Sequence, residues 1–411
     1  MQLTWALLSD LERQHGGPLF VADPGRLRAN YLRFRDAFRA VYAPTEIAYA
    51  CKANYLPALC REVTDAGGWV DVSSGMEYGL ARRAGVPGDR LVFNGPGKSE
   101  AEIARALSEG AIVNLESPCE VDMVMRAASV DKNQPGRVGL RCNPRRWTGL
   151  ESRFGFEPGE ELASAFGRLE ASPNCRVIGL HMHICTREKS VQTYARLAVG
   201  MLEVAGQLFR DRRPRYLNLG GGFFSSMEPF LREQFNCEVP DFESYAAAIA
   251  GPFARALRGA DDTTVLMLEP GLALVADVMS YCAQVTDVRK WYERRLALVA
   301  GTVYDMKLTF SQRNLPMQVI PKSSGEPGEE GLWNLTGYTC MEHDVLYRGY
   351  TGRLAPGDFV IFRNTGAYTL PLSPSFMRPR PAVVRLGANG RADILKRRES
   401  ADEALTTYNF L

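Results

Sequence analysis

The sequence is poor in histidine, in long apolar runs and in clustered charge. It has four histidines in 411 residues, too few for a His-rich metal site, so we predict no metal centre. No stretch approaches the roughly 18 uninterrupted apolar residues that a membrane-spanning helix needs. The formal net charge is +2 with basic and acidic residues interspersed, whereas nucleic-acid binders cluster their basic residues. We therefore predict neither a membrane nor a nucleic acid as a partner.

The sequence also lacks paired cysteine motifs and a recognisable targeting segment. The nine cysteines form an odd number and show neither CxxC nor Cys/His metal spacing, which is typical of reduced thiols in a cytoplasmic protein. The first run, MQLTWALLSDLERQHGG, has acidic residues early and no basic-then-apolar order, unlike a secretory signal. Both features predict a cytoplasmic location.

Short apolar runs alternate with amphipathic segments between residues 45 and 271. The runs are IAYACKA, WVDVSS, LVFNG, AIVNL, VGLRCNP, VIGLHMHI, YLNLGGG and TVLMLEPG. Strands that alternate with helices usually pair in parallel. Eight such units in about 250 residues match the size of a (β/α)8 TIM barrel, which we predict over residues 26–271. An open, doubly wound sheet is the alternative on pattern alone.

A different pattern begins at residue 272 and continues to the end of the chain. Strand-like runs such as RLALVAG, DFVIFRN and PAVVRLG are separated by Gly/Pro turns and show little helical periodicity. We predict a mostly β domain, built from residues 1–25 and 272–411. The predicted fold class is therefore α/β, a TIM barrel followed by a mostly β C-terminal domain.

Polar residues stand at the C-terminal ends of the predicted barrel strands, where the catalytic groups of such barrels collect. They are Lys52, Asp71, Arg141, His183, Gly220–Gly222 and Glu269. A lysine held in an apolar site has a lowered pKa and can form a Schiff base with a carbonyl cofactor. A lone lysine, however, more often only extends its amine to the surface. Six polar positions at corresponding strand ends favour the functional interpretation.

Two of these positions have their own alternatives. The glycine triplet lets backbone N–H groups approach a phosphate, and barrels commonly bind phosphate at their seventh and eighth strands, although tight turns use glycine too. Glu269 follows the eighth run and could hold a pyridine nitrogen protonated, or could form a structural salt bridge. His181 and His183 point to one face of their strand, so one can lie against a cofactor ring while the other is a core histidine.

With these residues in place, the chain resembles the fold-type III decarboxylases that depend on pyridoxal 5'-phosphate (PLP). That family includes the ornithine, arginine and meso-diaminopimelate decarboxylases. The resemblance runs from about Pro18 to about Phe376. It is carried, in order, by AYACKAN, DVSSGMEYGLA, FNGPGKS, SRFG, GLHMHI, NLGGGF, LEPG, CMEHDVL and GAY. It implies PLP as the cofactor, an amino acid as the substrate, and a homodimer with composite active sites.

The resemblance also implies roles for individual residues. Lys52 resembles the Schiff-base lysine, His183 the histidine that stacks on the pyridine ring, and Glu269 the partner of the pyridine nitrogen. Cys340 resembles the thiol that returns a proton to Cα after CO₂ leaves, and Asp344 a residue contributed with it across the dimer interface. The further cofactor-binding residues that the resemblance implies are Asp71, Glu77, Arg141, Thr186, Gly220, Gly221, Gly222, Gly271 and Tyr368.

The chain departs from the family pattern in the region that the family uses for substrate. Leu272 replaces an arginine that binds an anion, and Met341 replaces an acid that meets a distal amino group. The usual Arg-Pro motif is also missing, and YDMKL (304–308) stands in its place. The tentative substrate-binding residues are Met341, Glu342, Asp344, Lys307, Arg313 and Tyr368.

These departures favour a bulkier or conjugated amino acid over ornithine, lysine or diaminopimelate. The pattern is most similar to that of siderophore-pathway decarboxylases, whose substrate is an amino acid already joined to citrate. A decarboxylase of a basic amino acid or diaminopimelate remains an alternative, as does a racemase of the same barrel family. From a different class, the chain could be an inactive relative that serves as a binding or regulatory protein.

Overall fold

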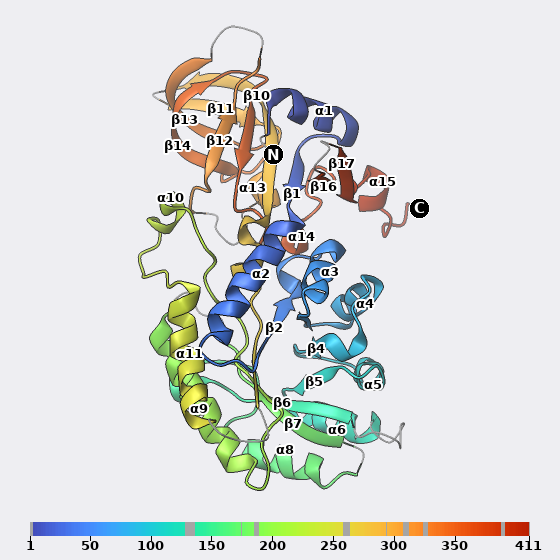
Figure 1. Ribbon diagram of the computed structural model, residues 1–411. Helices are drawn as coiled ribbons and strands as arrows, with labels where there is room; N and C mark the ends of the chain where they lie inside the picture. Colours follow the sequence, from blue (N-terminus) through green and yellow to red (C-terminus); the bar gives the residue numbers. More distant parts are fainter. Residues whose placement is uncertain are drawn as a thin grey trace. The chain divides into compact units, whose positions relative to one another are not determined.

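The computed structural model describes residues 3–127, 136–173, 175–184, 189–257, 264–292, 294–306, 312–323, 328–387 and 391–410. Contacts divide the chain into two units (Figure 1), each described here by itself. The barrel unit comprises Leu27–Ser226 and Cys237–Leu274, and the β-rich unit comprises Met1–Arg26, Met227–Asn236 and Val275–Leu411. The predicted boundaries at residues 26 and 271 did not foresee the inclusion of residues 227–236 in the β-rich unit.

Eight described strands close into a parallel barrel in sequence order, and the first and last pair through Thr45 and Leu266. They are β2 (Thr45–Ala50), β3 (Trp69–Val72), β4 (Leu91–Phe93), β5 (Ile112–Leu115), β6 (Gly136–Arg141), β7 (Cys175–His181), β8 (Tyr216–Asn218) and β9 (Val265–Leu268). Both faces of these strands are covered, which explains why they read as nearly continuous apolar runs. The predicted TIM barrel is confirmed.

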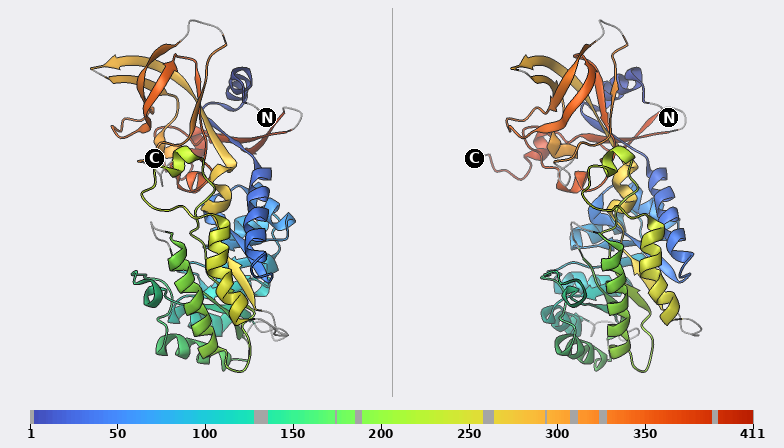
Figure 2. Two further views of the ribbon diagram at one scale, coloured as in Figure 1. Left: turned by 60° about the vertical axis from the view of Figure 1, so that its left-hand side comes forward. Right: turned by 90° about the vertical axis from the view of Figure 1, so that its left-hand side faces the viewer.

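Helices surround the barrel strands. They are α2 (Pro24–Arg39), α3 (Pro57–Asp65), α4 (Gly75–Arg83), α5 (Glu100–Ser108), α6 (Pro118–Ala127), α7 (Arg145–Thr148), α8 (Glu160–Glu170), α9 (Val191–Leu208), α11 (Phe242–Ala256) and α12 (Leu272–Val275), with short 3-10 turns η1 (Cys51–Ala53) and η2 (Gly88–Arg90). Helices α9 and α11 lie side by side in every view (Figures 1 and 2). Ser74 and Ser99 cap the N-termini of α4 and α5 through their hydroxyls, which fixes where the chain leaves β3 and β4.

The β-rich unit is built around one mixed sheet, in the order β14-β13-β11-β10-β1-β16-β17, with β15 joining β10 to β12. Its strands are β1 (Leu19–Ala22), β10 (Met279–Trp291), β11 (Arg294–Val299), β12 (Met317–Ile320), β13 (Glu329–Thr336), β14 (Val345–Leu354), β15 (Phe359–Phe362), β16 (Ala382–Leu386) and β17 (Ala392–Lys396). Its helices are α1 (Trp5–His15), α10 (Pro229–Arg232), α13 (Val303–Met306), α14 (Thr369–Leu372), α15 (Ala401–Ala404) and the 3-10 turn η3 (Ala276–Val278). The predicted mostly β domain is confirmed.

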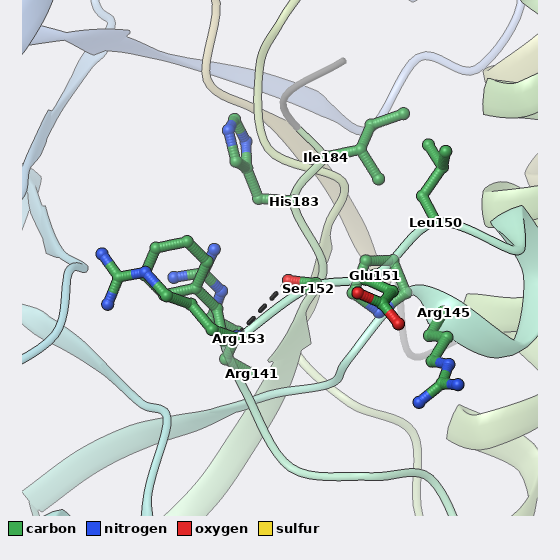
Figure 3. Close-up of a pocket in the computed structure, with 10 residues that line it drawn as sticks. Arg141, Arg145, Leu150, Glu151, Ser152, Arg153, His183 and Ile184 are labelled. Atoms are coloured by element: carbon green, nitrogen blue, oxygen red, sulfur yellow. Dashed lines mark hydrogen bonds between the residues drawn. The ribbon is translucent and has the colours of Figure 1, made fainter.

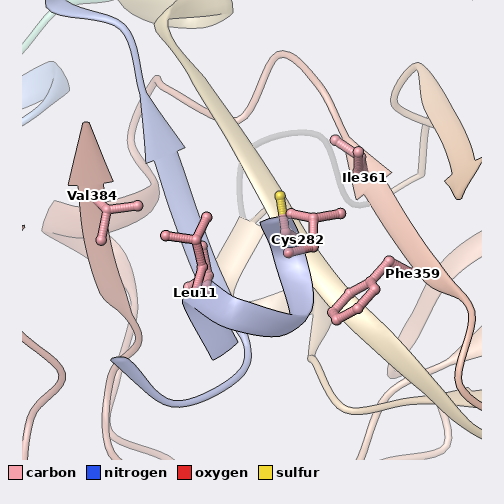
Figure 4. Close-up of a cluster of buried hydrophobic side chains, with 7 residues drawn as sticks. Leu11, Cys282, Phe359, Ile361 and Val384 are labelled. Atoms are coloured by element: carbon pink, nitrogen blue, oxygen red, sulfur yellow. The ribbon is translucent and has the colours of Figure 1, made fainter. Parts of the chain in front are cut away.

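The core of the β-rich unit joins the two ends of the chain (Figure 4). Leu11 of α1 packs with Cys282 of β10, Phe359 and Ile361 of β15 and Val384 of β16. Strand β1 pairs in parallel with β16 and antiparallel with β10, which explains why the first residues of the chain belong to this unit.

The segment Met227–Asn236 leaves the barrel sequence and packs in the β-rich unit. Glu228 forms an ion pair with Arg363 at 3.1 Å, and the Arg313 guanidinium lies 4.0 Å from the centre of the Phe235 ring. These contacts explain why residues 227–236 belong to the β-rich unit although the residues on either side belong to the barrel unit. Among the described residues of both units, no helix combines the length and apolar composition that a membrane crossing needs.

Candidate active site

The C-terminal ends of the barrel strands carry most of the predicted site residues. Lys52 lies in η1 directly after β2, Asp71 lies in β3, and Arg141 ends β6. His183 follows β7 by two residues, and Glu269 follows β9 directly. Because parallel strands end on the same side of a barrel, these side chains collect at one mouth.

Lys52 is paired with a fully buried carboxylate. Its Nζ lies 2.6 Å from Asp71 Oδ2 and donates to Ser73 Oγ at 3.2 Å. The Lys52 side chain is 35% exposed while that of Asp71 is 0% exposed, so the amine is reachable from the barrel mouth. Glu77 accepts the Ser73 backbone N–H at 2.6 Å and the Tyr55 hydroxyl at 2.9 Å. Glu77 therefore holds the backbone of Ser73 in the position from which its hydroxyl contacts Lys52 Nζ.

One asparagine links Asp71 to Glu269. Asn94 Nδ2 donates to Asp71 Oδ1 and to Glu269 Oε1, at 2.6 Å in both cases. Asn218 Nδ2 donates to the same Glu269 oxygen at 2.6 Å. We call Lys52, Asp71, Asn94 and Glu269 the carboxylate network. Since each buried carboxylate is hydrogen-bonded, the network avoids the cost of an unsatisfied buried charge.

The two carboxylates of this network differ in their protonation. Burial, followed by the charge of Glu269, raises the pKa of Asp71 to about 7. Burial also opposes the ionisation of Glu269, but the interaction with His181, which includes a hydrogen bond at 3.3 Å, and the charge of Lys52 outweigh it and lower the pKa of Glu269 below its ordinary value. Glu269 is therefore the ionised member, while Asp71 exchanges its proton near neutral pH.

His183 is held by the glycine run that follows β8. The Gly221 backbone N–H donates to His183 Nδ1 at 3.0 Å, and burial lowers the pKa of His183 well below its ordinary value. The imidazole is therefore neutral, with Nδ1 as the acceptor. A Cβ on Gly220 would lie 2.4 Å from His183 Nδ1, and one on Gly221 would lie 2.0 Å from the Glu269 backbone oxygen. Glycine is required at both positions because the backbone packs directly against these groups.

A cavity of about 530 Å³ opens between Arg141, His183 and the loop after β6 (Figure 3). Arg141 Nη1 donates to Glu116 Oε2 at 2.8 Å, and its guanidinium lies 4.5 Å from the centre of the Phe154 ring. The Arg141 side chain is only 9% exposed. Arg141 is thus fixed at the edge of the cavity, and its charge is offset by Glu116.

The β-rich unit carries the predicted proton donor and its neighbours. Cys340, Met341 and Glu342 are exposed in the turn between β13 and β14. The Asp344 carboxylate is buried and accepts four hydrogen bonds, from the Thr302 and Thr339 hydroxyls and from the Thr339 and Val303 backbone N–H groups. Asp344 therefore holds the turn that presents Cys340, and its oxygens are already engaged.

The remaining predicted residues are placed as follows. Tyr368 precedes α14 in a left-handed backbone conformation, with φ of 59°. Arg313 stacks on Phe235 within the β-rich unit. Gly271 precedes α12, where Leu272 is 9% exposed. Thr186 and Lys307 lie outside the described residues.

A comparison with known families shows to which family the chain belongs. The profile of the pyridoxal-binding domain of pyridoxal-dependent decarboxylases matches residues 25–276, more than half of the chain. The chain belongs to the pyridoxal-dependent decarboxylases. It is accordingly a PLP-dependent amino-acid decarboxylase.

Individual relatives of this decarboxylase match over nearly its whole length. The diaminopimelate decarboxylase of Methanothermobacter thermautotrophicus is 26% identical, over 97% of this chain and 93% of the relative. The L-glutamyl-[BtrI acyl-carrier protein] decarboxylase of Niallia circulans is 25% identical, over 99% and 97%. The crystal structure of the Helicobacter pylori diaminopimelate decarboxylase with L-lysine has a TM-score of 0.83 at 24% identity, covering 97% of this chain and 98% of that one. The structural likeness supports the fold.

The residues at the mouth of this decarboxylase fit PLP. PLP carries an aldehyde, a basic ring nitrogen and a phosphate, which call for an amine, an acid and backbone donors. The mouth offers the reachable amine of Lys52, the ionised carboxylate of Glu269 and a glycine run in which Gly220 and Gly222 have φ of 65° and 98°. Leu272, where the resemblance leads us to expect an arginine, is a departure on this side of the site.

Sequence reasoning missed the asparagines that join the site together. Asn94, Asn114 and Asn218 are buried, and Asn114 Nδ2 donates to Asn94 Oδ1 at 2.8 Å while its own Oδ1 accepts the Tyr216 hydroxyl at 2.5 Å. A signal was present: each asparagine is the single polar residue near the end of an apolar strand run, in LVFNG, AIVNL and YLNL. A buried amide at such a position needs partners, which marks it as part of a network.

Proposed function

We propose that the mouth of the barrel is the PLP site of this decarboxylase and that Lys52 binds the cofactor covalently. The carboxylate network carries this proposal, because it places a reachable amine, a proton-exchanging acid and an ionised acid in one hydrogen-bonded group. We assign His183 to the ring face and Glu269 to the ring nitrogen. The further cofactor contacts that we propose are Asp71, Glu77, Arg141, Thr186, Gly220, Gly221, Gly222, Gly271 and Tyr368.

Bound PLP supplies an electron sink for the pair that stays on Cα when CO₂ leaves the amino acid. Glu269 holds a proton on the pyridine nitrogen, because its own pKa is low enough to keep it ionised. Asp71 takes a proton from Lys52 Nζ and returns it, and its pKa of about 7 suits such exchange at neutral pH. His183, held neutral by burial, would lie against the ring of bound PLP without adding a positive charge there.

We propose that Cys340 delivers the proton that replaces CO₂ on Cα, and that it does so in the site of a second copy of the chain. The resemblance to the family supports a homodimer with composite sites. Asp344 supports the role of Cys340 indirectly, because it anchors the turn that exposes the thiol. A cytoplasmic location is part of the same proposal.

Mixing two inactive variants tests the composite homodimer. Lys52→Ala and Cys340→Ala are each expected to lose most activity, whereas refolding equal amounts together restores about a quarter of the active sites, because half of the dimers then contain one intact site out of two. Activity of the co-refolded sample is measured against each variant refolded alone. If Lys52 and Cys340 of one chain served the same site, no mixed dimer would contain an intact site and no activity would return.

We propose that the substrate is an amino acid joined to a second group, such as the citrate conjugates of siderophore assembly, rather than free ornithine, lysine or diaminopimelate. Met341 is 38% exposed beside Cys340 and cannot pair with an ammonium group. Leu272 is buried and cannot bind an anion. The Niallia circulans relative, named as a decarboxylase of glutamyl carried on an acyl-carrier protein, supports conjugated substrates within this family.

The second candidate is a decarboxylase of diaminopimelate or a basic amino acid. It is favoured by relatives such as the diaminopimelate decarboxylase of Aquifex aeolicus, which is 26% identical over 96% of this chain. The exposed carboxylate of Glu342 would then have to bind the distal amino group in place of the acid that Met341 replaces.

A CO₂-release screen separates the two candidates. We expect the PLP-loaded protein to decarboxylate at least one citryl or acyl conjugate of a diamino acid with kcat/KM at least about tenfold above that of the parent amino acid, which is the effect of one added favourable contact. Ornithine, lysine, diaminopimelate and their conjugates are compared at equal concentration. Efficient turnover of a free amino acid would decide for the second candidate.

A further inference from the structure

The cavity beside His183 is bordered by a loop that follows β6 and carries several arginines (Figure 3). Within the described residues, its lining includes Arg141, Arg145 and Arg153, with Glu151 as the one acid. A volume of about 530 Å³ falls within the range of pockets that hold cofactor-sized ligands. Arg141 and His183 are assigned to PLP, so the loop after β6 borders the part of the cavity that is left for the substrate arm.

The loop that borders the cavity is held where its two ends meet. The Asn143 backbone N–H donates to the Phe156 backbone oxygen at 2.8 Å, and the Phe156 backbone N–H donates to the Arg141 backbone oxygen at 2.8 Å. Asn143 Nδ2 also donates to the backbone oxygens of Ser152 and Phe154, at 2.9 and 3.0 Å. Because four such bonds fix the backbone of the loop, a ligand that binds to its side chains would lose little free energy to ordering the loop.

The arginines of the loop differ in how their charges are balanced. Arg141 is paired with Glu116. For Arg145 and Arg153, the described part of the chain provides no carboxylate within 4.0 Å. The Arg153 guanidinium lies 4.1 Å from the centre of the Phe154 ring, which orients its plane and leaves its N–H groups available. Two exposed guanidinium groups thus border the cavity without an acidic partner among these residues.

We propose that Arg145 and Arg153 form a subsite for a carboxylate on the distal arm of the substrate. A guanidinium binds a carboxylate through two parallel hydrogen bonds, and a second guanidinium in the same lining favours a polycarboxylate over a singly charged arm. Glu151 lies in the same lining and would repel an anionic arm, so it opposes the attraction of the two arginines. This subsite rests on the proposed function, since it gives the conjugated substrate its anionic part.

Titration calorimetry of the PLP-loaded protein with citrate tests the subsite directly. We expect citrate to bind, and Arg145→Gln and Arg153→Gln each to raise its Kd by about tenfold, as the loss of one bidentate contact does. Arg146→Gln is the matched control, because Arg146 is adjacent on α7 and is not part of the cavity lining. Glu151→Gln should lower the Kd. Thermal melting confirms that each variant is folded.

The outcomes separate the subsite from the proposed function. Absence of citrate binding to the wild-type protein, or an equal effect of Arg146→Gln and Arg153→Gln, overturns the subsite even if the protein releases CO₂. Arginine-dependent citrate binding in a protein that binds PLP but releases no CO₂ from any substrate supports the subsite and overturns the proposed function. A conjugate carrying an amide in place of its distal carboxylate should bind wild-type protein about as weakly as Arg153→Gln binds the acid.

Discussion

Replacing Lys52 with alanine is expected to give a folded, colourless protein that has lost at least about a thousandfold in kcat. Lys52 is the reachable amine of the carboxylate network, and its side chain is 35% exposed beside buried Asp71. Without the amine no covalent bond to the cofactor aldehyde forms, so the yellow absorption of the PLP-loaded protein disappears. The visible spectrum and the CO₂-release rate are measured after loading with PLP and dialysis.

Chemical labelling makes the test of Lys52 independent of activity. Borohydride reduction of the loaded wild-type protein should fix the cofactor to the peptide that contains Lys52, as detected by mass spectrometry. Lys290→Ala serves as a control, because Lys290 is exposed on β10 in the β-rich unit and its loss should leave the colour intact. Colour in Lys52→Ala, or the label on another lysine, would contradict the assignment. A wild-type protein that ignores PLP would instead be an inactive relative.

Replacing Glu269 with glutamine is expected to lower kcat on the order of 10²- to 10³-fold while PLP still binds. Glutamine keeps the shape of the side chain and can still accept from Asn94 and Asn218, but it removes the charge that keeps a proton on the ring nitrogen. The effect should fall on kcat more than on KM, because the charge matters when electrons move from Cα into the ring. Steady-state kinetics and the PLP dissociation constant measure the two effects separately.

The matched control for this variant is Glu120→Gln. Glu120 is also a buried carboxylate of the barrel unit, 3% exposed, but it pairs with Lys98 at 3.0 Å rather than with the carboxylate network. Its replacement should cost far less in kcat. Equal losses for both variants would mean that any buried charge in the barrel has the same effect, and the role proposed for Glu269 would be wrong.

The barrel and its mouth could be predicted because apolar strand-like runs alternate with amphipathic helical segments, and polar residues stand at the ends of the runs. Lys52 and Glu269 each follow an apolar run closely, and a parallel barrel brings all such ends to one side. Chain distance therefore does not matter: Asn94 Nδ2 lies 2.6 Å from an oxygen of Glu269, 175 residues away. What could not be read from the sequence was which polar groups contact each other, because that depends on the barrel register.

Loop residues were predicted less well, for a physical reason. Lys307 and Arg313 were named as substrate-binding candidates, yet Lys307 lies outside the described residues and Arg313 stacks on Phe235. Arg145 and Arg153, which border the cavity, were not named. A charged residue on a loop has the same local pattern whether it faces water or a ligand, and only the fold of the loop distinguishes the two cases.

The segment Met227–Asn236 limits how this chain can be divided. Because the chain passes from one unit to the other four times, the barrel is not a continuous stretch that can be excised by cutting near residue 274. Such a fragment would keep Leu231, which is 1% exposed in the whole chain, without the rest of the β-rich unit to which it belongs. Protein engineers who wish to transplant the barrel mouth would have to bridge Ser226 to Cys237 with a short linker. A variant of the barrel therefore has to be designed together with the β-rich unit, although each unit has its own core.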